Sequence, residues 1–180
     1  TGDEVADWEQ AAARVRAVTD PDAGVIEQFE GYFQLREVAI ETWDENAMPQ
    51  YPTGYHHFNL EDTTLLKQPD AVMLMYLLPD EYSLATQRAN FEFYEARTLH
   101  KSSLSPSIHA IVGLQVGDPT MAVQYFERSA YVDLDDNQGN TAEGMHIASA
   151  GGTWQVTVHG FGGMRVLGGE LTFAPRLPDR

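Results

Sequence analysis

The sequence predicts a mainly α-helical fold that ends in a β-hairpin. Apolar residues recur at helical spacing more often than in strand-like alternation, and short turn signals separate the helical runs. Near the end of the chain, alternation on both sides of Gly168 and Gly169 is typical of a hairpin. We expect the helices to pack as antiparallel pairs, and the hairpin to begin a β domain that the chain does not complete.

The first third of the chain is predicted to hold one helix and two irregular segments. The helix covers Asp3–Val18, where apolar residues share one face, and Asp20–Asp22 ends it. The short aromatic segment Gly24–Leu35 is expected to be buried and extended or irregular. Glu41–Phe58 is rich in proline and glycine and is predicted to be a long loop, a type of segment that often carries function.

The rest of the chain is predicted to be helical up to the hairpin. Glu61–Thr63 can cap a helix that runs to Leu78, with Pro69 marking the first turn of its main part. Thr141–Gly144 can cap the last helix. The other predicted helices cover Leu84–Glu95, Leu104–Val116, Thr120–Leu134 and Met145–His159, and the hairpin strands cover Met164–Val166 and Glu170–Phe173.

Composition limits the kinds of partner. The 180 residues are 43% hydrophobic, which is enough for a core, and the formal net charge is −16. Such a charge repels nucleic acid and anionic membranes, and no apolar run is long enough to span a bilayer. Cysteine is absent, which excludes disulfides and thiolate chemistry. We expect a cytoplasmic protein that binds neither nucleic acid nor membranes.

A cluster of cations and hydroxyls precedes one predicted helix. Ser102 and Ser103 follow Arg97, His100 and Lys101 directly before the apolar run. A helix N-terminus exposes free N–H groups and a partial positive charge, so this cluster is a candidate anion pocket. The alternative is ordinary serine capping beside a surface lysine.

Two further sets of polar residues are candidates for sugar binding. Lys67 and Gln68 stand at the start of an apolar helix and can form directed hydrogen bonds to hydroxyls. Alternatively, the lysine extends along the surface and the glutamine caps the helix. Glu95 is flanked by aromatic residues, so its pKa could be raised by burial or it could accept bonds from hydroxyls. Its alternative role is an ion pair with Arg97 or Lys101.

The remaining candidates are histidines and acids in turns. His146 follows a polar turn and can donate to an anion, although a lone histidine is more often structural. Pro79–Tyr82 contains two acids, and we interpret them as part of a turn between helices. His56 and His57 have no acids at ligand spacing, so no metal site is predicted.

Several of these stretches together resemble glycoside hydrolase family 65, the group of maltose, trehalose and kojibiose phosphorylases. They read GVIEQFEGYFQL, LLKQPDAVMLMYLLPDEYS, ANFEFYEARTLHKSSLSPSIHAI, GNTAEGMHIASAGGTWQ, and GFGGMRV followed by GELTFAPRLP. They occur in the family's order over nearly the whole chain. The resemblance implies the C-terminal half of an (α/α)6 barrel over residues 1–163 and the start of a C-terminal β-sheet domain over residues 164–180.

The resemblance also implies an activity: inverting phosphorolysis of an α-glucosyl disaccharide or glucoside to β-glucose 1-phosphate. Inorganic phosphate is then the co-substrate, and no other cofactor is expected. By resemblance, the sugar contacts are Lys67, Gln68 and Glu95, and the phosphate contacts are Ser102, Ser103 and His146. The acceptor sugar stays open among maltose, trehalose, kojibiose, nigerose and glucosylglycerol.

One departure from the family's pattern concerns the general acid. In the family the acid lies upstream of the equivalent of Trp8, so the role is not transferred to Glu81, and no catalytic residue is assigned in this chain. We therefore expect the chain to be inactive alone, and to need the N-terminal part of its polypeptide or a partner chain, a homodimer being one such form. The alternatives are a trehalase-like hydrolase of the same family and a non-catalytic carbohydrate-binding fragment.

Overall fold

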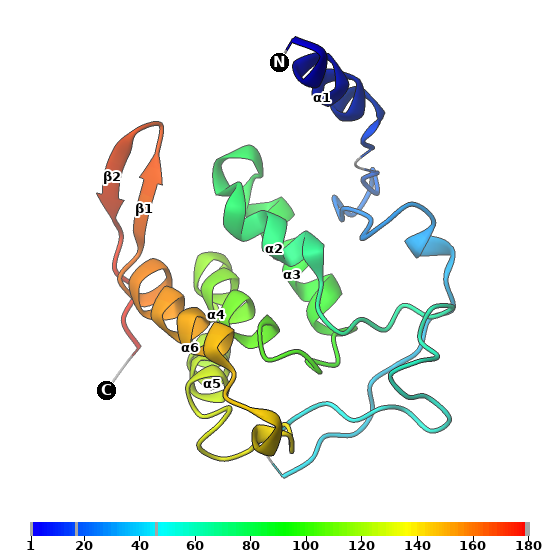
Figure 1. The fold of residues 1–180 in the computed structure, drawn as a ribbon, viewed down its shortest axis with the longest axis vertical. Helices are drawn as coiled ribbons and strands as arrows, with labels where there is room; N and C mark the ends of the chain where they lie inside the picture. Colours follow the sequence, from blue (N-terminus) through cyan, green and yellow to red (C-terminus); the bar gives the residue numbers. More distant parts are fainter. Residues whose placement is uncertain (1, 17, 46, 179–180) are drawn as a thin grey trace.

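The computed structural model describes residues 2–16, 18–45 and 47–178, and it is mainly helical with a small two-stranded sheet (Figure 1). This confirms the predicted fold class. The helices and strands are α1 (Gly2–Arg14), α2 (Asp70–Leu77), α3 (Leu84–Glu95), α4 (Ser105–Val116), α5 (Pro119–Ala130), α6 (Ile147–Gln155), β1 (Met164–Leu167) and β2 (Glu170–Phe173). None of the helices in the described ranges is long and apolar enough to cross a membrane.

Helix α4 lies at the centre of the helical body. All of its residues except Gln115 are buried, and Ile111 and Val112 are 0% exposed. A helix that is apolar on all sides must be surrounded by other elements. Accordingly, α4 contacts α2, α3, α5 and α6, while α3 also contacts α2 and α5 also contacts α6. The helices therefore alternate between two layers, with α2, α4 and α6 in one layer and α3 and α5 in the other.

Short turns reverse the chain between successive helices. Gly117 ends α4 with a φ of 92°, a conformation that favours glycine, and Asp118 and Pro119 then start α5. Between α2 and α3, the 3₁₀ turn Pro79–Glu81 and the N-cap Ser83 do the same. As a result α2, α4 and α6 run in the same direction, and their N-termini lie at the same end of the body (Figure 1).

The irregular segment before α2 is fastened to α3 by buried polar side chains. Asn90 accepts from the Ile26 N–H at 2.8 Å and donates to the Gly24 carbonyl at 3.0 Å. The hydroxyl of buried Tyr32 donates to the Thr64 carbonyl at 2.5 Å. Gly24–Leu35 is irregular as predicted, but it is buried only in part: Val25 and Ile26 belong to the core, while Phe29 and Phe33 are exposed.

Three predicted helices have different bounds in the structure. The first ends at Arg14, and its apolar face is exposed to solvent, including Trp8 at 73%. The second begins only at Asp70, because Thr63 and Leu66 pair with other segments as isolated bridges; Glu61–Thr63 therefore cap no helix. The last begins at Ile147 with His146 as its N-cap, and continues as a π-helical turn to Phe161, so Thr141–Gly144 do not cap it.

The other predicted elements are close to the observed ones. Helix α3 has the predicted bounds, α4 begins one residue later than predicted, and α5 begins one residue earlier but ends at Ala130 instead of Leu134. The hairpin is confirmed: β1 and β2 pair antiparallel, and Gly168 and Gly169 at its turn both have positive φ. The domain boundary between residues 163 and 164 stays a prediction, and residues 1, 17, 46, 179 and 180 of the predicted domains lie outside the described residues.

Candidate functional site

The sequence-predicted polar clusters stand at corresponding places in the fold. Lys67 and Gln68 lie just before the N-cap of α2, Ser102 and Ser103 lie just before the N-cap of α4, and His146 is the N-cap of α6. Because these helices are parallel, the structure brings all three clusters to the same end of the helical body (Figure 1). We call this the site end. Nothing in the local sequence pattern specifies this arrangement, which follows from the alternation of the two layers.

The helices differ in how their N-termini are capped. Ser83 accepts from the Thr86 N–H at 3.1 Å and caps α3, and Asp118 accepts from the Met121 N–H at 2.9 Å and caps α5. Within the described residues, the N-cap residues of α2, α4 and α6 form no such side-chain bond. One first-turn amide of α2, that of Ala71, donates instead to Gln28 at 3.1 Å.

The uncapped N-termini of the site-end helices have a chemical consequence. Free amides and the helix dipole give an N-terminus a partial positive charge, which favours an anion or an oxygen-rich ligand. The N-termini at the opposite end are closed by side chains of their own. The capping pattern thus distinguishes one end of the body from the other in the way a ligand site would.

The serine turn before α4 is held in a fixed conformation. His100 is fully buried and has a φ of 50°, which is unusual for a residue with a side chain. Its Nδ1 lies 2.9 Å from the Ser105 hydroxyl. Ser102 is buried, and its hydroxyl accepts from the Leu104 N–H at 3.3 Å. The serines therefore precede the helix rather than forming its first turn, which begins at Ser105.

His146 is oriented by a carboxylate that the sequence analysis missed. Its Nδ1 lies 2.6 Å from one oxygen of Asp133, and its backbone N–H donates to the other oxygen at 2.8 Å. The hydrogen bond from the His146 side chain is the main reason why the pKa of Asp133 lies below its ordinary value. The ring is held through Nδ1, and Nε2 remains available for a ligand. The two residues are far apart in sequence, so no spacing signal marked the pair.

Lys67 and Gln68 are exposed at the site end. Their side chains make no hydrogen bond within the described residues, and the N-cap of α2 is Pro69 rather than Gln68. Gln68 also lines a cavity of about 60 Å³ between the N-termini of α2 and α4. Both side chains are thus free to bind a ligand, and the alternative of helix capping by Gln68 is wrong.

Glu95 has different partners from those the sequence suggested. Its carboxylate lies 2.5 Å from Nδ1 of His109 and accepts a bond from the Tyr125 hydroxyl. The expected partner Arg97 pairs instead with Glu37 at 3.0 Å.

The pKa of Glu95 also moves in the opposite direction to the one suggested. Burial raises this pKa, but the imidazoles of His109 and His100 lower it by more, so it lies well below its usual value. A raised pKa could be expected from aromatic neighbours in the sequence. Only the fold brings two histidines to the carboxylate.

A buried polar network extends from Glu95. The Tyr125 hydroxyl lies 2.8 Å from Nε2 of His100, and burial lowers the pKa of His100 to about 4. Glu95, His100 and His109 each offer a ligand atom, and these atoms lie within 4.8 Å of one another, which is close enough for a metal ion. In the structure the same groups bond to each other and to Tyr125. Their geometry is that of a hydrogen-bond network.

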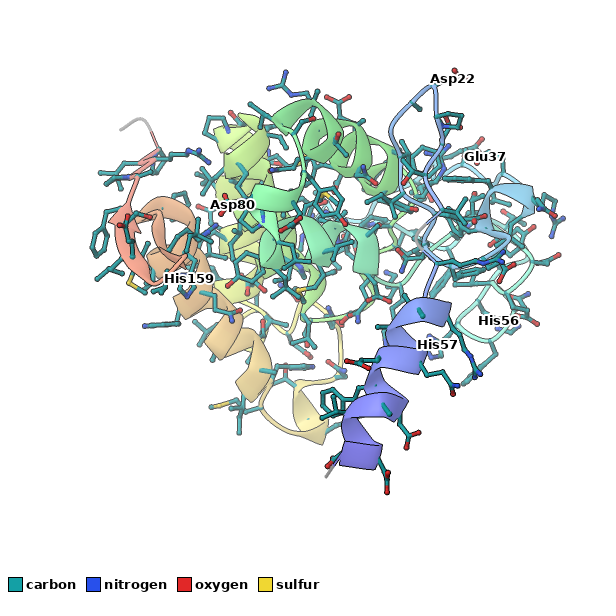
Figure 2. The ribbon with its side chains drawn as sticks, turned by 90° about the horizontal axis from the view of Figure 1, so that it is seen from above. Asp22, Glu37, His56, His57, Asp80 and His159 are labelled. Atoms are coloured by element: carbon teal, nitrogen blue, oxygen red, sulfur yellow. The ribbon has the colours of Figure 1, made fainter. Side chains whose placement is uncertain are left out.

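Two other candidates lie outside the three polar clusters. Pro79–Glu81 form the turn between α2 and α3, at the opposite end of these helices, which agrees with their interpretation as turn residues. His56 and His57 are exposed on the long loop, and Figure 2 shows them well apart from Asp80. Neither group contributes to the cluster around α2, α4 and α6.

Comparisons with known proteins relate this chain to sugar phosphorylases. Residues 1–155 match the family model "Glycosyl hydrolase family 65 central catalytic domain". The kojibiose phosphorylase of Caldanaerobacter subterraneus subsp. tengcongensis is 52% identical over 100% of this chain and 24% of its own length. The α,α-trehalose phosphorylase of Geobacillus stearothermophilus is 35% identical over 100% of this chain and 23% of its own length.

A solved structure has a similar fold. The protein described as "Putative kojibiose phosphorylase from human microbiome" superposes with a TM-score of 0.83 at 35% identity, over 98% of this chain and 23% of that one. The chain therefore spans about a quarter of the length of the relatives it matches. The comparisons establish the kind of domain, and the roles of the site-end residues stay predictions.

Proposed function

Because the chain belongs to glycosyl hydrolase family 65, we propose that it forms part of the active site of an inverting phosphorylase. The enzyme would cleave an α-glucosyl disaccharide or glucoside and release β-glucose 1-phosphate. The observation that carries the proposal is the site end, where α4 and α6 have no side-chain cap and where Ser102, Ser103 and His146 lie beside their N-termini. Such a site suits a small anion despite the net charge of −16, because local donors hold the anion.

In the proposed reaction, phosphate replaces the water and base of an inverting hydrolase. A phosphate oxygen forms a bond to the anomeric carbon from the face opposite the glycosidic oxygen. The bond to that oxygen breaks, and a carboxylic acid supplied from outside this chain protonates it. The relevant acid is not Glu81, which lies in the turn at the other end of α2. This chain therefore contributes the sugar- and phosphate-binding side of the reaction.

The proposed roles of the residues follow from their positions. Ser102 and Ser103 would donate to phosphate together with amides at the start of α4. His146 would bind phosphate through Nε2, since Asp133 holds Nδ1 at 2.6 Å. Lys67 and Gln68 would bind sugar hydroxyls, because their side chains are exposed at the same end. A charge-assisted bond of this kind contributes about 1.5–3 kcal/mol.

The hydrolase alternative requires a carboxylate that can activate water at this end. Asp133 is the carboxylate beside His146, and both of its oxygens already accept bonds from that residue. Asp133 is therefore not free to activate water, which supports phosphate as the attacking group. The non-catalytic alternative predicts sugar binding without turnover, even when the rest of a phosphorylase is supplied.

We also propose a setting for the activity. Inorganic phosphate is the co-substrate, with no other cofactor, and the enzyme works in the cytoplasm, which suits a chain without cysteine. The rest of the site comes from further polypeptide, because the matched relatives are about four times longer than the part of them that aligns. A homodimer is one form such an enzyme could take.

A chimera tests the proposed function. In it, this chain replaces the matching segment of the kojibiose phosphorylase of Caldanaerobacter subterraneus, to which it is 52% identical. We expect release of β-glucose 1-phosphate from kojibiose only when phosphate is present. Turnover without phosphate would support the hydrolase instead, and sugar binding without any turnover would support the non-catalytic alternative. The unmodified parent enzyme is the control.

A further inference from the structure

Buried His109 has an unused nitrogen beside the site end. The side chain is 0% exposed, and its Nε2 has no hydrogen-bond partner within the described part of the chain. A buried polar atom without a partner is costly, and in native structures it usually indicates a bound water, an ion or a ligand group. His109 is not among the residues to which the proposed function assigns a role.

The ring of His109 lines the cavity of about 60 Å³ that also contains Gln68 and Ser105. Glu95 is not part of this cavity's lining; it opens to a separate groove between α3 and α5, lined also by Arg88 and Met121. Nδ1 of His109 is bonded to Glu95, so Nε2 is the nitrogen of this lining residue that has no partner among the described residues. The rest of the lining is largely apolar and includes Met73, Leu104 and Ile108. The wall is mostly apolar, and besides His109 it carries the polar side chains of Gln68, Asp70 and Ser105, so the cavity suits a single hydroxyl on a carbon skeleton.

Glu95 determines which nitrogen of His109 faces the cavity. One carboxylate oxygen accepts from the Tyr125 hydroxyl and the other lies 2.5 Å from Nδ1 of His109. An ionised carboxylate can only accept, so Nδ1 carries a proton and the ring cannot turn without losing this bond. This is the arrangement in which a carboxylate orients a histidine for another partner.

We propose that His109 binds one hydroxyl of the glucosyl unit through Nε2, and that Glu95 is a positioning residue which acts on the sugar only through His109. The proposal rests on the proposed function, since it takes the site end to be the sugar site. It replaces a direct contact between Glu95 and the sugar with an indirect one. It also assigns Gln68 and His109 to the same hydroxyl-binding cavity, on opposite sides of the gap between α2 and α4.

The test uses the chimera in the direction of synthesis, with analogues of β-glucose 1-phosphate that each lack one hydroxyl. In the unsubstituted chimera, removal of the hydroxyl that His109 binds should lower kcat/KM by about 10- to 100-fold. We call the fold-decrease in kcat/KM on removal of a given hydroxyl the penalty for that hydroxyl. In His109→Ala this penalty should disappear for that analogue and persist for the others. If every penalty persists unchanged in His109→Ala, the proposal is wrong.

Two further variants separate positioning from structural damage. Glu95→Gln should shrink the penalty for the same hydroxyl and for no other. His100→Gln removes a buried histidine of the same network that does not line the cavity. It should lower stability and leave the pattern of penalties unchanged. The same hydroxyl-specific pattern in His100→Gln would show a general loss of structure and contradict the proposal.

A crystal structure of the chimera with glucose gives a result that does not depend on turnover. A sugar hydroxyl within hydrogen-bond distance of Nε2 supports the proposal, and a cavity that holds only water or a metal ion while glucose binds elsewhere refutes it. The two proposals fail differently. Turnover without phosphate contradicts the phosphorylase, and the glucose complex then still tests His109. Phosphate-dependent turnover in which His109→Ala leaves every penalty unchanged contradicts only the role of His109.

Discussion

At the scale of single residues, the site end combines groups that we propose bind a ligand with groups that hold them in place. Asp133 orients His146, and Glu95 orients His109, each through a close contact to Nδ1. A histidine can act reliably only if one nitrogen is fixed, because the neutral ring has two tautomers and can turn over. The other ring nitrogens and the serine hydroxyls are the groups that we propose bind the ligand.

The phosphate-binding role can be tested by removing one donor at a time. Ser102→Ala or His146→Ala in the chimera should raise KM for phosphate by about 10- to 100-fold, the loss of one charge-assisted hydrogen bond. The KM for the sugar should change much less. Steady-state kinetics with each substrate varied in turn measure both constants. Equal changes in the two constants would place these residues outside the phosphate pocket.

The buried His100 predicts a dependence of stability on pH. Burial lowers its pKa from 6.5 to about 4, so between these values the unfolded chain binds more protons than the folded one. Stability should therefore fall as the pH drops from about 6.5 to about 4, by up to about 3 kcal/mol from this residue. Glu95, whose pKa is lowered, adds a loss in the same direction at still lower pH.

Urea unfolding of the chimera at several pH values measures this effect. His100→Gln has no proton to gain in this window, so its stability should change less between pH 6.5 and pH 4. Identical slopes for the two proteins would mean that His100 becomes protonated within the folded state at its ordinary pKa.

At the scale of elements, the packing of α6 against α4 depends on one glycine. A Cβ atom at Gly152 would lie 2.5 Å from the Ser107 hydroxyl and 2.8 Å from its Cβ, which is too close without a shift of the helices. At the neighbouring Gly151, which is exposed, a Cβ would meet nothing within 4 Å. The pair offers a matched comparison on one helix.

Gly152→Ala should destabilise the chimera by about 1–3 kcal/mol, the typical effect of forcing a group into a packed interface. It should also raise KM for phosphate, because α6 carries His146 at its N-terminus. Gly151→Ala should instead stabilise by up to about 1 kcal/mol, since alanine favours a helix over glycine. Thermal unfolding compares the two, and equal effects would mean that this contact does not set the helix spacing.

At the scale of the whole molecule, the two layers decide where ligands can bind. Their alternation puts the N-termini of α2, α4 and α6 together, while the side-chain caps of α3 and α5 belong to helices that run the other way. The apolar face of α1, with Val5 and Trp8 exposed, shows that this chain alone leaves apolar surface uncovered. Both features agree with a segment of a larger active site.

The isolated chain should therefore show no phosphorolysis, while the chimera does. The physical reason is that the general acid must protonate the leaving oxygen, and the chain supplies only the binding groups. Assays of glucose 1-phosphate release from the isolated chain and the chimera, at equal concentration, make the comparison. Detectable phosphorolysis by the isolated chain would show that it holds an acid of its own.

Local patterns in the sequence determined much of this protein. Helix periodicity, the turn at Gly117–Pro119 and the paired glycines of the hairpin predicted α3, α4, α5 and the β-hairpin, because each depends on residues close together in the chain. The motifs also indicated the family and the polar clusters before α2, α4 and α6. The local signals failed for α2, where pairing of Thr63 and Leu66 with distant segments overrode the helix pattern.

Tertiary structure alone decided which side chains meet. The pairing of Glu95 with His109 and Tyr125, and of Asp133 with His146, joins residues on different elements, so no spacing in the sequence reports it. The shared direction of the site-end helices arises in the same way, from the packing of alternate helices into two layers. The sequence by itself determined the helices and their polar ends, because those depend on neighbours in the chain. The fold brought those ends together and set the orientation and pKa of the groups among them, because these properties depend on contacts across space.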